Sequence, residues 1–207
     1  MLVLASASPR RQELLRNAGI PFTVHPADVD ETPLPSESAR TCAERLAKQK
    51  ALKISRGNPQ AYVLGADTVV VLNEQTLNKP VDVEDAVRML QLLSGRVHQV
   101  ITGVCVVHPV DAPQPPVVTK PPEPAPYAVL TAEGRQLLLA CETTSVTMTQ
   151  ISDAEIREYV ATGEPMDKAG AYAIQGRASR WIPRIEGDYC NVVGLPVALV
   201  HRMLTGK

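Results

Sequence analysis

The sequence contains few aromatic residues and no excess of either charge. Among 207 residues there are one Phe, one Trp and five Tyr, and the formal net charge is −1. Proteins that bind nucleic acid usually carry a basic excess, and those that bind single strands stack the bases on aromatic side chains. The composition therefore argues against a nucleic-acid-binding protein, although a local basic cluster could still bind a small anion.

Cysteine pairs, long apolar runs and a P-loop are also lacking. Cys42, Cys105, Cys141 and Cys190 form no Cys-x-x-Cys pair, so a zinc site is poorly supported. No apolar run is long enough to span a bilayer, and the first residues do not resemble a secretion signal. We therefore expect free thiols, a cytoplasmic location and no membrane partner. The absence of Gly-x-x-x-x-Gly-Lys-[Ser/Thr] excludes a P-loop enzyme.

The segment 6–11, Ser-Ala-Ser-Pro-Arg-Arg, follows a short apolar run that predicts a buried strand. Ser8 is a good N-cap, and Pro9 suits the first residue of a helix. Arg10 and Arg11 then place two cations in the first helical turn, where the helix dipole favours anions. A bound phosphate would resolve this conflict, and the alternative is that both arginines lie on the surface.

A long helix is predicted from Ser36 to about Arg56. Its apolar stripe passes through Leu46 and Ala47 and also contains Lys50. A lysine on an inward face can extend to solvent, or it can pair with an anion in a cleft. We favour the cleft because a buried ammonium group needs a partner.

The apolar run 62–72 predicts a buried strand that contains one carboxylate, Asp67. A buried carboxylate is costly unless it is paired, hydrogen-bonded or bound to a metal. Gly65 and Ala66 would leave the approach to it uncrowded, so we interpret Asp67 as the best catalytic candidate. The alternative is a structural aspartate that caps a turn between two strands. Thr68 beside it could bond a ligand or the backbone.

Two later segments have unusual compositions. Residues 109–126 hold eight prolines, and we interpret them as a surface insertion and not as a fold element. Residues 163–176 are rich in small side chains, as a backbone that lies close to a ligand would be. Within the second segment, Gln175 has both a donor and acceptors, which suits recognition of a base edge. His98 is interpreted as a structural histidine.

Patterning predicts the remaining elements. We expect strands at 22–24, 97–107, 136–148 and 181–185, helices capped by Asp82 and by a Ser152/Glu155 capping box, and a loop at 187–196 before a final helix.

Taken together, these residues resemble the Maf family of nucleoside triphosphate pyrophosphatases. The matching blocks occur in family order and span almost the whole chain: 4–11, 45–51, 65–68, 79–80, 93–95 with His98, 163–176 and 186–196. The resemblance implies an α/β fold of the inosine triphosphate pyrophosphatase type, with a mixed twisted sheet, flanking helices and two lobes around a nucleotide cleft. It implies a single domain, 1–207, with the Pro-rich insertion at about 109–126, and it suggests a homodimer.

The resemblance also implies hydrolysis of a nucleoside triphosphate to the monophosphate and pyrophosphate with a divalent cation, Mg²⁺ or Mn²⁺. The Ala-Ile-Gln-Gly sequence at 173–176 resembles the branch of the family that acts on dTTP and UTP, with CTP or modified pyrimidine nucleotides as further substrates. Asp67 falls on the position of the proton acceptor, and Glu31 falls on a metal or water partner, so both are candidate catalytic residues and candidate metal ligands. The triphosphate contacts fall on Ser6, Arg10, Arg11, Lys50 and Lys79. The two lysines are also candidate catalytic residues. Substrate choice falls on Arg10, Thr68 and Gln175.

The chemistry of these residue types agrees with that implication. Attack by water at the α-phosphorus needs a carboxylate as base or metal ligand, and it needs cations on the triphosphate. Three features depart from the family pattern: the length of the insertion, Cys190 where Ser is frequent, and the basic run 177–180.

Two alternatives stay open. One is the same chemistry on 7-methyl-GTP or another non-standard nucleotide, against which Gln175 argues. The other is a non-catalytic nucleotide-binding regulator of cell division, against which the presence of Asp67 and Lys79 argues.

Overall fold

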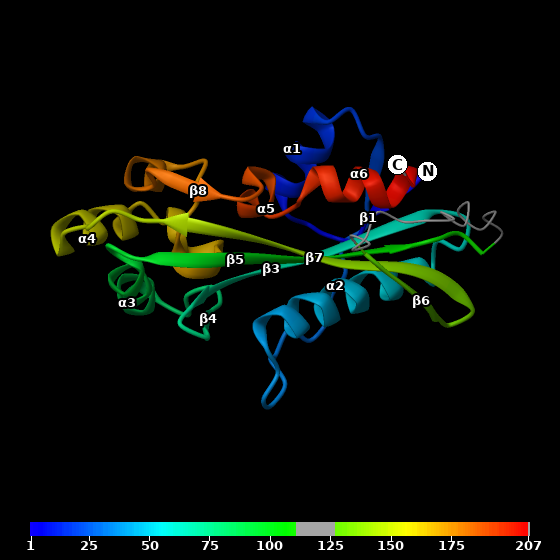
Figure 1. Cartoon of the computed structure of the whole chain (residues 1–207), viewed down its shortest axis with the longest axis horizontal. Helices are drawn as coiled ribbons and strands as arrows, with labels where there is room; N and C mark the ends of the chain where they lie inside the picture. The colour runs from blue at the N-terminus through cyan, green and yellow to red at the C-terminus, as the bar shows by residue number, and fades with distance from the viewer. Residues whose placement is uncertain (111–126, 207) are drawn as a thin grey trace. The chain divides into compact units, whose positions relative to one another are not determined.

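The computed structural model describes residues 1–110 and 127–206, and these residues form a mixed sheet of eight strands flanked by helices (Figure 1). The strand order is β2-β1-β3-β5-β7-β6, with β4 paired to β3 and β8 paired to β7. The first strand is parallel to β2 and β3, whereas the β3–β4, β6–β7 and β7–β8 pairs are antiparallel. The predicted fold class, a mixed α/β sheet with flanking helices, is confirmed.

The strands are β1 (Leu2–Leu4), β2 (Phe22–Val24), β3 (Tyr62–Leu72), β4 (Gln75–Leu77), β5 (Val97–Val107), β6 (Ala128–Ala132), β7 (Arg135–Thr147) and β8 (Arg184–Glu186). The α-helices are α1 (Pro9–Asn17), α2 (Ala39–Ser55), α3 (Val83–Leu93), α4 (Asp153–Ala161), α5 (Tyr189–Val193) and α6 (Val197–Thr205). Short 3₁₀ helices are η1 (Glu164–Asp167), η2 (Ala169–Ala171) and η3 (Arg177–Trp181).

The described residues divide into two compact units, each built from separate segments of the chain. Unit 1 comprises Met1–Asp67, Thr102–Glu142 and Gly194–Lys207, and unit 2 comprises Thr68–Ile101 and Thr143–Val193. The prediction of one domain over 1–207, and that of a nucleotide cleft, stay predictions. The predicted Pro-rich insertion lies outside the described residues from position 111 onward.

Unit 1 packs helices against the strands that carry the candidate site. Figure 1 shows α2 on one face of these strands and α1 and α6 on the other. A buried cluster joins Ala47 and Ala51 of α2 to Val3 of β1 and Val63 of β3. The helix approaches β3 most closely at Gly65, where a side chain would meet the backbone of α2.

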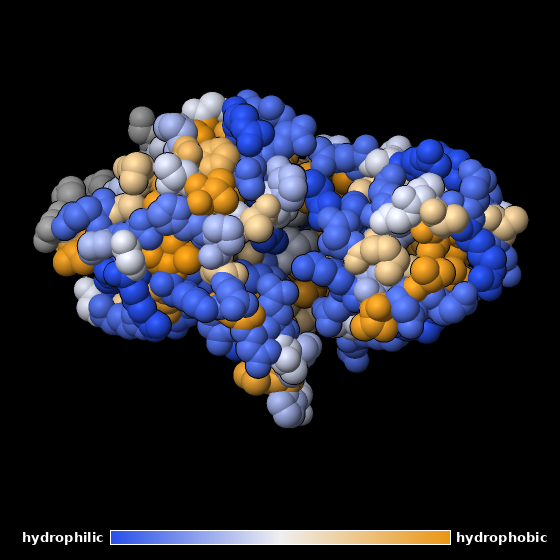
Figure 2. Space-filling model, turned by 180° about the vertical axis from the view of Figure 1, so that it is seen from behind, coloured by the Kyte–Doolittle hydropathy of each residue, from blue (hydrophilic) through white to orange (hydrophobic). Residues whose placement is uncertain are grey.

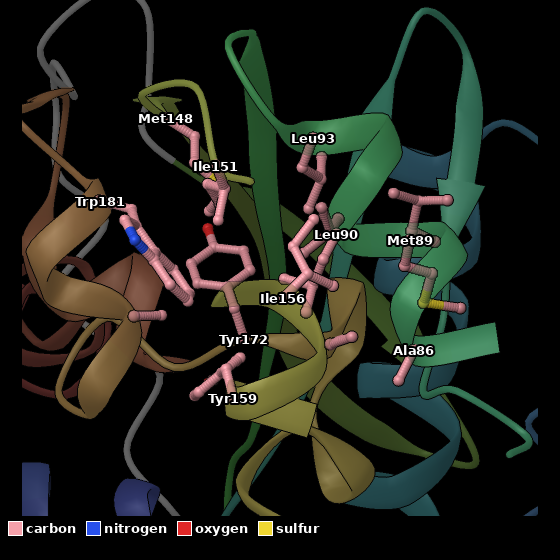
Figure 3. Close-up of a cluster of buried hydrophobic side chains, with 14 of the residues drawn as sticks. Ala86, Met89, Leu90, Leu93, Met148, Ile151, Ile156, Tyr159, Tyr172 and Trp181 are labelled. Carbon is pink, nitrogen blue, oxygen red and sulfur yellow. The ribbon is translucent and has the colours of Figure 1, made fainter. Parts of the chain in front are cut away.

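Unit 2 has its own hydrophobic core, in which α3 and α4 pack together. The close-up in Figure 3 shows Leu90 of α3, Ile156 and Tyr159 of α4, and Trp181 of η3 in one buried cluster. The rings of Tyr159 and Trp181 meet edge to face, with centroids 5.4 Å apart. This core supports the segment that carries Gln175.

Several predicted boundaries are confirmed, and others are wrong. The long helix begins at Ala39 because the side chain of Ser38 accepts a hydrogen bond from the amide of Thr41, while Ser36 has a left-handed backbone with φ of 62°. The predicted strand 181–185 is wrong at its start, since Trp181 ends η3 and the strand begins at Arg184.

Several elements were not predicted. The strands β4 and β6 and the 3₁₀ helices η1, η2 and η3 were missed, and the predicted loop 187–196 contains the short helix α5. The face shown in Figure 2 is mostly hydrophilic, with separate hydrophobic areas. Among the described residues, no helix combines the length and the apolar character needed to cross a membrane.

Candidate active site

The turn between β1 and α1 is held by Ser6. Its hydroxyl oxygen, in a side chain that is almost completely buried, accepts hydrogen bonds from the amide of Ser8 at 3.2 Å and from Nη1 of Arg11 at 3.1 Å. Ser8 is the N-cap residue, but its own side chain makes no capping hydrogen bond, and the first turn contains no acidic residue. The first turn of α1 therefore keeps the positive character that suits an anion.

Arg11 points into unit 1. Its Nε donates to the carbonyl of Gly194 at 2.8 Å, and its Nη1 donates to the carbonyl of Ala66 at 2.9 Å. Burial lowers the pKa of Arg11, while Asp67 and Glu31 act in the opposite direction. The alternative that both arginines lie on the surface is therefore wrong for Arg11, which links the β1–α1 turn to β3.

Lys50 joins two carboxylates from different parts of unit 1. Its Nζ lies 2.6 Å from Oδ1 of Asp67 and 2.6 Å from Oε1 of Glu31. The side chains of Lys50 and Asp67 are 8% and 11% exposed, whereas that of Glu31 is 49% exposed. The predicted inward position of Lys50 is confirmed, and the alternative in which it extends to solvent is wrong. A buried ammonium group with two anionic partners avoids the high cost of an unpaired charge.

Two glycines allow α2 to bring Lys50 to this position. A Cβ at Gly65 would lie 2.2 Å from the carbonyl oxygen of Ala47, and one at Gly103 would lie 2.3 Å from that of Ala43. Both contacts are with the backbone of α2, which cannot move aside as a flexible side chain can. The expectation that Gly65 clears the approach of a ligand is therefore replaced: its missing side chain makes room for α2.

Asp67 lies within the continuous strand β3, two residues beyond Gly65. The alternative in which Asp67 caps a turn between two strands is wrong, since β3 runs from Tyr62 to Leu72 without a break. Asp67 is the one charged residue of β3, and the ion pair with Lys50 compensates for the burial of its carboxylate.

The carboxylates of Asp67 and Glu31 lie close enough together to act as a donor pair for a divalent cation. Both touch the same Nζ atom, so their oxygens can be no further apart than the sum of two 2.6 Å contacts. Residues 1–110 and 127–206 contain no group of three or more His, Cys, Asp or Glu side chains arranged around a metal position. Mg²⁺ typically uses one or two carboxylates and completes its shell with water and substrate phosphates, so this pair fits such an ion.

The structure thus brings together five predicted residues within unit 1: Ser6, Arg11, Glu31, Lys50 and Asp67. Arg10 is half-buried beside Arg11 in α1. Three others belong to unit 2. Thr68 is the next residue of β3, Lys79 is exposed just after β4, and Gln175 is exposed between η2 and η3.

Sequence reasoning missed the two backbone carbonyls that fix Arg11. Those of Ala66 and Gly194 accept from its guanidinium group, although Gly194 is 183 residues away in the chain. A carbonyl group carries no sequence signal of its own. The one available hint was Gly194 itself, whose φ of 126° is unfavourable for other residues.

A mixed α/β sheet that places a cationic turn beside an ammonium group and two carboxylates defines a class: an α/β protein with a site suited to a polyanion and a divalent cation. Within that class, the chain belongs to the Maf-like protein family, whose model matches residues 1–207.

Relatives of similar length support this membership. The chain is 47% identical over 203 residues to a Koribacter versatilis protein named dTTP/UTP pyrophosphatase. The match covers 98% of this chain and 92% of that protein. It is 48% identical over 204 residues to the Symbiobacterium thermophilum protein of the same name, and the match covers 99% of this chain and 92% of that protein. A Geobacter sulfurreducens protein, also named dTTP/UTP pyrophosphatase, is 46% identical over 199 residues. This match covers 96% of this chain and 92% of that protein.

Proposed function

We propose that this protein hydrolyses dTTP and UTP to the nucleoside monophosphate and pyrophosphate. The observation that carries the proposal is Asp67, a carboxylate in a buried strand, paired at 2.6 Å with Lys50, which also touches Glu31. The names of relatives that are 46–48% identical over nearly their full length support the choice of substrate.

In this proposal, Asp67 is the proton acceptor. It removes a proton from the attacking water, whose oxygen forms the new bond to the α-phosphorus. The bond between that phosphorus and the oxygen bridging to the β-phosphorus breaks, and pyrophosphate leaves with the bond electrons. Lys50 fixes the orientation of the Asp67 carboxylate through the 2.6 Å ion pair, and a general base needs such a fixed position.

Asp67 and Glu31 would also hold Mg²⁺ or Mn²⁺, which would supply positive charge to the phosphates in the transition state. Ser6, Arg10, Arg11, Lys50 and Lys79 are proposed to contact the triphosphate. Thr68 and Gln175, with Arg10, are proposed to select the nucleotide. A carboxamide such as that of Gln175 can donate to one position of a base edge and accept from its neighbour.

A cytoplasmic location, a homodimer and the absence of nucleic-acid or membrane partners belong to the same proposal. The four cysteines are free thiols, which agrees with a reducing compartment. The near-neutral net charge of −1 agrees with a small-molecule substrate.

A nucleotide panel tests the proposal. Pyrophosphate release is measured from dTTP, UTP, CTP, GTP and 7-methyl-GTP with Mg²⁺ or Mn²⁺. We expect the highest kcat/KM for dTTP and UTP. Release mainly from 7-methyl-GTP would overturn the substrate and keep the chemistry. If no nucleotide is cleaved but dTTP raises the melting temperature, the protein binds nucleotides without catalysis and the proposal fails.

A further inference from the structure

The turn that carries Gln175 is fixed from both sides by two residues with no assigned role. Gln175 lies between η2 and η3, and its side chain is exposed. The amides of Ala173 and Arg177, two residues before and two residues after it, both donate hydrogen bonds to side chains from α4 and η1. Exposed turns are usually variable in conformation, so two anchors at this short spacing are informative.

Tyr159 is the anchor on the N-terminal side. Its side chain, 1% exposed in α4, packs its ring edge to face against Trp181 (Figure 3). The hydroxyl oxygen accepts a hydrogen bond from the amide of Ala173 at 3.3 Å, and the hydroxyl group donates to Oε1 of Glu164 at 2.9 Å. Burial, and to a smaller extent the hydrogen bond to Glu164, raises the pKa of Tyr159, so the hydroxyl stays protonated and remains a donor.

Glu164 is the anchor on the C-terminal side. Its Oε1 accepts the amide of Arg177 at 3.1 Å in addition to the tyrosine hydroxyl. A Cβ at Gly176 would lie 1.9 Å from the same oxygen, so the carboxylate lies directly against the backbone of the turn. One carboxylate therefore connects Tyr159 to both residues that follow Gln175.

The position of this turn matters because the hydrogen-bonding pattern alone does not distinguish the bases. Uracil and thymine present a carbonyl oxygen next to an N–H group, and guanine presents the same pair on a larger ring system. A carboxamide can satisfy either base. Discrimination then depends on how far from the base the amide of Gln175 is held, which the turn decides.

We infer that Tyr159 and Glu164 are positioning residues for nucleotide choice, which hold the 173–177 turn so that Gln175 accepts a single-ring uracil or thymine base and excludes the larger guanine. This inference rests on the proposed function and extends it from Gln175 to the residues behind it. Loss of either anchor lets the turn move away from the position of the base, and guanine then fits beside Gln175.

The test compares the ratio of kcat/KM for dTTP to that for GTP. Tyr159→Phe removes the hydroxyl and keeps the ring, and Glu164→Ala removes the carboxylate. We expect each to lower the ratio by about tenfold, the scale set by one or two hydrogen bonds. Glu164→Gln retains an acceptor oxygen and should keep most of the ratio. Combined with Gln175→Ala, neither change should lower the ratio further, because both act through that residue.

The matched control is Tyr172→Phe. This change removes a buried tyrosine hydroxyl that bonds His98 at 2.8 Å and leaves the hydrogen bonds made by Tyr159 and Glu164 in place. It should lower the melting temperature without changing the ratio. Wild-type ratios in both Tyr159→Phe and Glu164→Ala, or an equal change in Tyr172→Phe, would overturn the inference.

Equilibrium binding separates failure of the inference from failure of the proposed function. If the wild-type protein cleaves no nucleotide, the proposed function fails, and the same variants are compared by their dissociation constants for dTTP and GTP. A lower preference for dTTP in Tyr159→Phe and Glu164→Ala then supports the inference. An unchanged preference, or no binding of either nucleotide by the wild-type protein, overturns it.

Discussion

Gly65→Ala should separate Lys50 from Asp67 without altering either residue. The added methyl carbon would lie 2.2 Å from the carbonyl oxygen of Ala47 and 2.8 Å from the amide nitrogen of Ala51, both in the backbone of α2. Ordinary contact begins near 3.4 Å, so α2 must move away from β3 by roughly 1 Å. Lys50 moves with its helix, and its 2.6 Å contact with Asp67 is lost or weakened.

The expected cost follows from two independent effects. Overpacking against a rigid backbone lowers the free energy of unfolding by about 3 kcal/mol, which corresponds to roughly 10 °C in melting temperature for a chain of this size. A displacement of about 1 Å at a catalytic group lowers kcat by about 100-fold. Thermal unfolding and pyrophosphate release from dTTP measure the two effects separately.

Gly57→Ala is the matched control. A Cβ at Gly57 meets only the carbonyl oxygen of Ile54, at 3.9 Å, so this change should leave the free energy of unfolding within about 0.5 kcal/mol and kcat unchanged. If Gly65→Ala melts and reacts as the wild-type protein does, the packing of α2 against β3 does not set the position of Lys50.

Three further predictions concern other contacts. Arg11→Lys cannot replace three guanidinium hydrogen bonds to Ser6, Ala66 and Gly194, so thermal unfolding should show a loss of about 2 kcal/mol, and an unchanged melting temperature would contradict this. Burial lowers the pKa of His98 from 6.5 to about 4, so only the unfolded chain binds this proton between those pH values. The free energy of unfolding should therefore fall by ~3 kcal/mol as the pH drops from 6.5 to about 4, and His98→Gln should flatten the fall in a pH series of denaturant titrations. Ser152→Ala removes the capping box of α4 and should cost about 1 kcal/mol in the same titrations, while a neutral result would show that the cap is dispensable.

Most secondary structure followed from local patterns. The strand at 62–72 and the helix cap at Asp82 were predicted correctly because apolar runs and capping side chains act over a few residues. The start of α2 was misplaced because Ser36 and Ser38 are equally good caps in sequence, and only the left-handed backbone at Ser36 separates them. Short strands such as β4 were missed because three residues carry little periodicity.

The candidate site, too, could be predicted from the sequence only in part. Asp67 and Lys50 could be found from sequence because a charge in an apolar pattern stands out. The pairing of Lys50 with Glu31 joins an exposed loop to a buried helix face, and no local sequence pattern predicts this contact. The role of Gly65 was misassigned because its neighbour is the backbone of α2, which depends on tertiary packing.

The most direct test of the proposed chemistry is the fate of the oxygen of water. Hydrolysis of dTTP in ¹⁸O-labelled water, followed by mass spectrometry, should place the label in the phosphate of dTMP and leave pyrophosphate unlabelled. Asp67→Asn should remove both the product and the label while the protein remains folded. Label in pyrophosphate or in inorganic phosphate, or full activity in Asp67→Asn, would contradict attack at the α-phosphorus by a water that Asp67 activates.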